Sequence, residues 1–89
     1  MCRNIRPLFN YDPPATEADI RSASTQFVRK ISGFNKPSKA NEAAFAQAVE
    51  AISAAASRLL EQLETTAPKR DRAKEIAMRR MRAVERFGR

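Results

Sequence analysis

Residues 45–63 read FAQAVEAISAAASRLLEQL, and this stretch decides the fold. Apolar residues recur there every three or four positions, at Phe45, Val49, Ile52, Ala56, Leu59 and Leu63. This spacing predicts one apolar seam along an α-helix, which Leu60 widens. We expect the helix over 38–65, capped by Ser38 or Asn41 and ending before Pro68.

At 1.5 Å per residue such a helix is about 40 Å long, which exceeds the width of about 30 Å that a compact domain of this size has. Part of the helix therefore projects from the core or is covered by another surface. A second copy of the chain is one candidate, which would make a homodimer through this helix.

A second helix is expected upstream, over 16–34. Ile20, Phe27 and Ile31 belong to its apolar stripe, Thr16 is a good N-cap, and Gly33 suits a left-handed C-terminal cap. Residues 1–14 form an N-terminal arm that ends in Pro13-Pro14.

A third helix is expected over 68–87, with Pro68 in its first turn. Residues 68–89 hold 9 basic and 3 acidic side chains, whereas residues 1–67 hold 8 and 7, so most of the net charge of +7 lies at the C-terminal end. We therefore predict an all-α single domain over 1–89, a small bundle built on an antiparallel helical hairpin with a basic C-terminal helix.

Composition argues against most enzyme classes. Histidine is absent, which removes imidazole bases and ordinary zinc sites, and no glycine-rich nucleotide motif occurs. We expect neither catalysis nor a cofactor or metal. No apolar run reaches the ~18 residues of a membrane span, and a single cysteine suits a reducing compartment, so a cytoplasmic protein is expected.

The N-terminal residues Cys2, Arg3 and Asn4 are the first candidate binding group. Removal of Met1 would leave a terminal cysteine whose amine and thiol are adjacent, and nearby arginine favours the thiolate. A redox or metal-responsive role for Cys2 follows from this interpretation. A terminal segment without a function is the alternative.

The connector between the first two helices is the second candidate. It offers cations and hydroxyls that could hold a phosphate or an acidic side chain at the start of the long helix: Arg29, Lys30, Ser32, Lys36, Ser38 and Lys39. Ordinary helix caps and solvated lysines explain the same residues without a ligand.

The arginines of the third helix are the third candidate: Arg72, Arg79, Arg80, Arg82 and Arg86. Arginine clustered on one helix is the usual footprint of a nucleic-acid surface, although few aromatic residues accompany it here. An acidic protein partner or a solvated helix would use the same residues.

Several strings resemble a small bacterial family, domain of unknown function 2277: Met1-Cys2-Arg3-Asn4-Ile5, Leu8-Phe9-Asn10, Pro13-Pro14-Ala15-Thr16, Val28-Arg29-Lys30-Ile31-Ser32-Gly33-Phe34 and Lys36-Pro37-Ser38. The resemblance covers almost the whole chain and implies no activity. It does imply that the N-terminus and the connector matter for function.

The order of elements over 8–63 is also similar to a chaperone J-domain. Ser32-Gly33-Phe34 stand near the place of the His-Pro-Asp signature of that family, so this likeness implies a helical hairpin and no chaperone activity. The sequence thus predicts a non-enzymatic interaction module for an anionic or macromolecular partner. Nucleic-acid binding through the third helix is the alternative.

Overall fold

A computed structural model describes the backbone of residues 5–87 and the side chains of residues 5–82. Most of this chain is helical, as predicted, and a two-stranded sheet is added to the helices. In chain order the elements are β1 (Tyr11–Asp12), α1 (Glu17–Ser32), the 3₁₀ turn η1 (Lys39–Asn41), α2 (Glu42–Gln62), β2 (Arg70–Asp71) and α3 (Arg72–Phe87).

Helix α1 has the two caps that the sequence predicts, although it ends at Ser32, two residues before the end expected. The Thr16 hydroxyl accepts a hydrogen bond from the Asp19 amide (3.2 Å), and the Asp19 carboxylate accepts one from the Thr16 amide (2.8 Å). These reciprocal bonds form a capping box, which satisfies two backbone donors at the start of the helix. At the other end Gly33 has φ 77°, and its N–H donates to the Arg29 carbonyl (2.9 Å). The left-handed C-terminal cap is confirmed.

Helix α2 is shorter than the 38–65 expected. Residues 39–41 form η1 instead. Asn41 precedes α2 without a side-chain cap, and its amide nitrogen donates to the Ser38 hydroxyl (2.8 Å). The backbone becomes extended at Leu63. The 21 residues of α2 span about 31 Å rather than about 40 Å.

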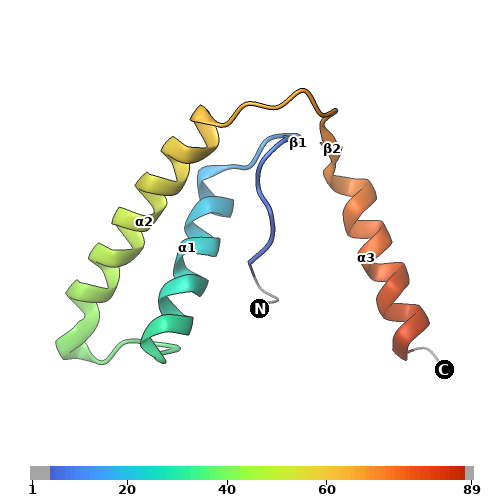
Figure 1. The fold of residues 1–89 in the computed structure, drawn as a ribbon. Coiled ribbons are helices and arrows are strands. Elements are labelled where there is room, and N and C mark those ends of the chain that lie inside the picture. Colours follow the sequence, from blue (N-terminus) through green and yellow to red (C-terminus); the bar gives the residue numbers. More distant parts are fainter. Residues whose placement is uncertain (1–4, 88–89) are drawn as a thin grey trace.

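Helices α1 and α2 pack side by side, and α2 runs back along α1 after the connector (Figure 1). Ile20 and Val28 of α1 and Val49 of α2 are buried between them. Buried Ser24 donates its hydroxyl hydrogen to the Ile20 carbonyl (2.8 Å), so this polar group is satisfied. The predicted seam is only partly covered, since Leu59 remains 54% exposed.

The parallel pairing of β1 with β2 was not predicted. Tyr11 pairs with Arg70 and Asp12 with Asp71, so extended backbone occupies the positions where the third helix was expected. The prediction that Pro68 opens this helix is therefore wrong. Helix α3 begins at Arg72, because the Asp71 carboxylate accepts a hydrogen bond from the Lys74 amide (2.9 Å) and acts as its N-cap.

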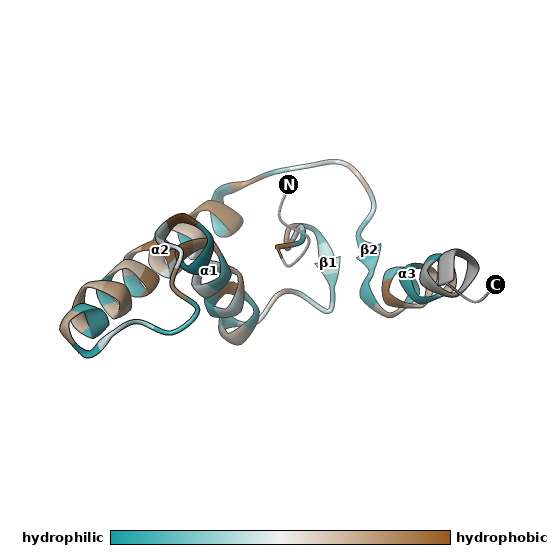
Figure 2. Ribbon diagram, turned by 90° about the horizontal axis from the view of Figure 1, so that it is seen from below, coloured by the Kyte–Doolittle hydropathy of each residue, from teal (hydrophilic) through white to brown (hydrophobic). Residues whose placement is uncertain are grey.

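Helix α3 extends away from the hairpin, with the N-terminal arm between α3 and α1 (Figure 1). Apolar residues gather on α1 and α2, whereas β2 and much of α3 are hydrophilic (Figure 2). No helix within the described part of the chain is both long and apolar enough to cross a membrane.

Candidate functional site

The junction between the N-terminal arm and α3 depends on Asn10 and the two short strands. Asn10 has φ 65°, a left-handed conformation that asparagine tolerates better than most residues. Its side-chain amide donates to the carbonyls of Pro68 (3.0 Å) and Ala67 (3.4 Å), and its own carbonyl accepts from the Arg70 amide (2.8 Å). Asn10 therefore fixes the chain just before α3 against the arm.

Tyr11 is the centre of this junction and is only 6% exposed. Its hydroxyl donates to the Glu75 carboxylate (2.5 Å) and accepts from the Arg70 guanidinium (3.4 Å). The Arg70 and Arg72 guanidinium carbons lie 5.7 and 5.9 Å from the ring centroid, within the range of cation–π attraction. The hydrogen bond to Tyr11 raises the pKa of Arg70 above its ordinary value. One aromatic side chain thus connects the arm to β2 and to the first turn of α3.

Asp19 connects α1 to α3. Its carboxylate accepts the capping bond from Thr16 and a second bond from the Arg72 guanidinium (2.9 Å), with both ionic side chains about one-third exposed. The backbone bond from Thr16 and the side-chain bond from Arg72 lower the pKa of Asp19 below its ordinary value. The same carboxylate therefore caps the N-terminus of α1 and holds the first turn of α3.

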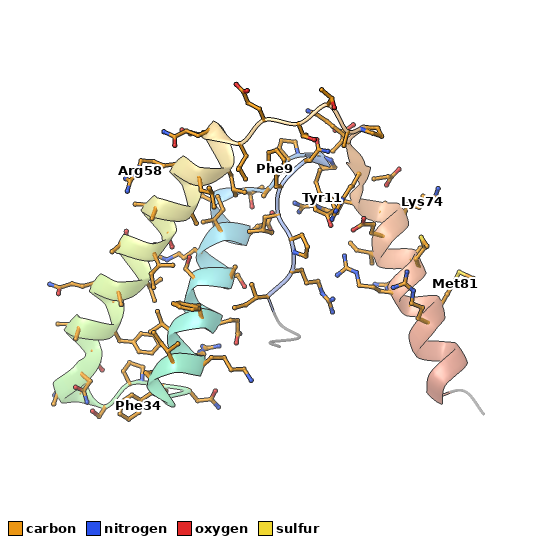
Figure 3. All side chains as sticks on the ribbon, viewed as in Figure 1. Phe9, Tyr11, Phe34, Arg58, Lys74 and Met81 are labelled. Atoms are coloured by element: carbon orange, nitrogen blue, oxygen red, sulfur yellow. The ribbon has the colours of Figure 1, made fainter. Side chains whose placement is uncertain are left out.

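A cavity of about 220 Å³ opens beside this junction, and we name it the arginine pocket. Its walls come from the arm, α1 and α3: Arg6, Pro7, Leu8, Tyr11, Asp19, Arg72, Ile76 and Arg79. Arg72 and Arg79 are two helical turns apart, so both lie on the face of α3 that looks toward the arm. The stick view shows Tyr11 between the arm and α3 at this junction (Figure 3).

Positive charge exceeds negative charge in the arginine pocket. Three guanidinium groups meet one carboxylate there, and Asp19 already pairs with Arg72. Among the side chains that the structure describes, Arg6 and Arg79 form no ion pair. Guanidinium groups that line one cavity and outnumber its carboxylates suit a bound oxyanion, to which each could donate two parallel hydrogen bonds.

The predicted arginine face of α3 is divided by the structure. Arg72 and Arg79 line the arginine pocket and are half-buried, whereas Arg80 and Arg82 are exposed. Arg86 lies in the last turn, beyond the described side chains. The arginines of α3 therefore do not form one exposed face. They form a basic surface that begins in the pocket and continues onto the exposed side of the helix.

The predicted connector site lies at the opposite end of the hairpin from β1, β2 and the start of α3 (Figure 1). Both of its hydroxyls serve local structure: Ser32 accepts from the Phe34 amide (3.2 Å) and Ser38 from the Asn41 side chain. The cations Arg29, Lys30, Lys36 and Lys39 are spread along the end of α1, the loop and η1. The structure does not bring the connector and α3 together.

The third predicted group, Cys2, Arg3 and Asn4, lies outside the described residues. Within the described residues, no three His, Cys, Asp or Glu side chains form a group that could hold a metal ion.

Sequence reasoning missed Tyr11, Arg6, Asp19 and Glu75 as site residues. Tyr11 is the chain's one tyrosine and stands in a turn-forming stretch before two prolines, which was the available signal. Its partners are about 60 positions away, so no local pattern connects them.

The description "Uncharacterized conserved protein (DUF2277)" belongs to a family model that matches residues 1–78. The chain belongs to this family. The match spans the arm, the hairpin and the first half of α3, so every wall of the arginine pocket except Arg79 falls within the DUF2277 region. No match was found among curated proteins or among solved structures.

Proposed function

We propose that this DUF2277 protein is a non-enzymatic interaction module that binds an anionic partner through the arginine pocket and the adjoining basic side of α3. The antiparallel hairpin of α1 and α2 serves as the scaffold, and the arm and α3 supply the binding groups. The observation that carries this proposal is the meeting of Arg6, Arg72 and Arg79 around one cavity that contains a single carboxylate.

Burial strengthens this attraction. Arg72 keeps only 28% of its side-chain surface, and Tyr11, Leu8 and Ile76 give part of the wall apolar surface. An anion in such a partly apolar cavity interacts with guanidinium groups more strongly than it does at an open surface, because water screens the charges less. The exposed Arg80 and Arg82 would extend the contact along a macromolecule.

The test compares two variants that lose the same charge. Arg6→Gln with Arg79→Gln removes two cations from the arginine pocket, and Arg29→Gln with Lys36→Gln removes two from the connector end. Binding of a labelled polyglutamate peptide, a labelled single strand and a labelled duplex is titrated from low to physiological salt. We expect the pocket variant to bind at least tenfold more weakly than wild type, with little change in the connector variant. Equal losses would show that net charge alone attracts the anion and would refute a localised site.

Nucleic-acid binding is the second candidate, favoured by seven basic side chains within residues 69–82: Lys69, Arg70, Arg72, Lys74, Arg79, Arg80 and Arg82. If a duplex is the partner, the logarithm of the binding constant should fall linearly with the logarithm of the salt concentration, with a slope of about 0.9 for each phosphate contacted. Preference for the oligonucleotides over polyglutamate at equal ionic strength would support nucleic acid. The reverse preference would support an acidic protein partner.

The Cys2 interpretation remains a third and separate proposal. Its test is the Cys2→Ser variant, measured for oligonucleotide and polyglutamate binding under oxidising and reducing conditions. A redox role requires that wild type respond to the change in conditions and that the variant not respond.

A further inference from the structure

Because α3 extends away from the hairpin, the molecule is less compact than is usual for a chain of this length. The radius of gyration is 15.8 Å, whereas a compact chain of 89 residues has a value of about 12 Å. Apart from the Arg72–Asp19 ion pair, α3 contacts the rest of the chain through β2 and the arm instead of packing along α1 or α2 (Figure 1). One side of this helix is therefore without a partner within the described residues.

That side, the outer face of α3, is apolar with cations at its edges. It is opposite the arginine pocket, since Met81 lies about 180° around the helix from Arg72. Met81 is 64% exposed, and it points away from the arm together with Lys74 (Figure 3). Ala73 and Ala77 continue the apolar strip, and Lys74 and Arg80 flank it.

A groove of complementary character runs along the hairpin and is bordered at one end by the N-terminal arm. Two adjoining hollows of about 460 and 430 Å³ share Glu17, Ile20 and Ser57 as walls. Their floor includes Leu60 and Ala54, and Glu50 and Glu61 add two more carboxylates. We call this the acidic groove.

Two cations, Arg21 and Lys69, also border the acidic groove, so carboxylates outnumber cations by one. Arg21 pairs with Glu50, but both side chains are more than half exposed, and an ion pair of this kind contributes little. Glu50 is therefore available to exchange partners.

The apolar strip of α3 is shorter than the acidic groove, and the two surfaces are complementary in charge. Glu50 and Glu61 are separated by about 16 Å along α2, and Ala73 and Met81 by about 12 Å along α3. In a docked arrangement, the alanines and Met81 would cover the apolar floor, while Lys74 and Arg80 would approach the carboxylates at the edges.

The chain's own α3 does not reach the acidic groove. The first turn of α3 is held at the arm by the β1–β2 pairing, the Tyr11–Glu75 hydrogen bond and the Arg72–Asp19 ion pair. These contacts direct α3 away from the groove. We propose that the outer face of α3 docks in the acidic groove of a second copy and that the second copy docks in return, which gives a two-fold symmetric dimer.

The dimer uses the side of α3 opposite the arginine pocket, and Arg6 and Arg79 line neither the acidic groove nor the outer face. The pocket variant with Arg6→Gln and Arg79→Gln should therefore weaken anion binding and leave the dimer intact, so anion binding and self-association can fail separately.

The test is a charge exchange in the full-length chain, with mass read by light scattering over a range of concentrations. One variant carries Glu17→Lys and Glu61→Lys, and the other carries Lys74→Glu and Arg80→Glu. Wild type should be a dimer, at twice the 10.0 kDa of the monomer. Each variant alone should dissociate at least ~100-fold more readily, because like charges meet at both contacts.

An equal mixture of the two variants should restore the dimer, since each basic groove then meets an acidic helix and each acidic groove meets a basic one. The control variant carries Glu42→Lys and Glu64→Lys, which change the charge equally outside the groove and should leave the dimer unchanged. A wild type that is monomeric at every concentration, or a mixture that stays monomeric, overturns the proposal.

A geometric measurement covers the case in which a charge variant fails to fold. Chains with Cys2→Ser and Ala54→Cys are mixed with chains carrying Cys2→Ser and Ala77→Cys, then oxidised with diamide. The expected product is a mixed disulfide dimer formed in preference to either symmetric one. A statistical mixture of the three dimers would contradict docking of α3 in the groove.

Discussion

The substitution Tyr11→Phe tests the attachment of α3 most directly. It removes the hydroxyl that donates to Glu75 (2.5 Å) and accepts from Arg70 (3.4 Å), and it keeps the ring beneath the two guanidinium groups. A hydrogen bond to a charged acceptor contributes about 1.5–3 kcal/mol. Because the Tyr11–Glu75 pair is only partly buried, we expect the lower end, about 1.5 kcal/mol, which is about tenfold in the equilibrium between attached and detached α3.

The assay is amide hydrogen exchange of peptides from α3 and, in the same sample, from α2. In Tyr11→Phe the α3 amides should exchange about tenfold faster, whereas the α2 amides should be unchanged, since the hairpin does not depend on the hydroxyl. Glu75→Gln and the double variant complete a double-mutant cycle. An unchanged exchange rate in α3, or a coupling energy below about 0.3 kcal/mol between the two positions, would refute the role given to this bond.

Three further substitutions test the scaffold. Val49→Ala deletes two buried carbons from the hairpin core and should lower the free energy of unfolding in urea by about 2 kcal/mol; a loss below about 0.5 kcal/mol would mean that the side chain is not packed. Gly33→Ala meets no atom within 4 Å but must adopt φ 77°, so it should cost about 1 kcal/mol, and an unchanged midpoint would contradict the left-handed cap. The lowered pKa of Asp19 stabilises the fold above its ordinary value of 3.8, and this stabilisation is lost as the pH falls through the lowered pKa. Asp19→Asn should therefore flatten the acid side of the stability profile, measured by urea unfolding between pH 5 and pH 2, and a profile identical to wild type would disprove the linkage.

The hairpin was predictable because its signals are local. Thr16 and Gly33 mark the ends of α1 through bonds within four positions, and the seam around Val49 has helical spacing. The heptad spacing of this seam did not indicate which of its residues would be buried against α1. Val49 is buried and Leu59 is 54% exposed, although both fit the same heptad pattern.

The arginine pocket was not predictable from local patterns. Two-residue strands carry no alternation of apolar and polar side chains, and β1 pairs with a segment 59 positions away. The charge asymmetry did identify the arginine-rich helix. It did not show that Arg72 and Arg79 turn toward the arm while Arg80 stays exposed, because that depends on Tyr11 and Asp19.

The pairing of β1 with β2 also determines when the arginine pocket can form. Arg6 and Tyr11 precede the hairpin and Arg72 and Arg79 follow it, so the whole hairpin lies inside the loop that the strand pairing closes. Contacts between near neighbours in the sequence form first, and closing a long loop costs more entropy than closing a short one. We therefore expect the hairpin to fold before its two flanks meet. A chain that stops short of β2, or whose α3 is still within the ribosome, lacks Arg72 and Arg79 at the junction, so binding at this site requires the chain through α3.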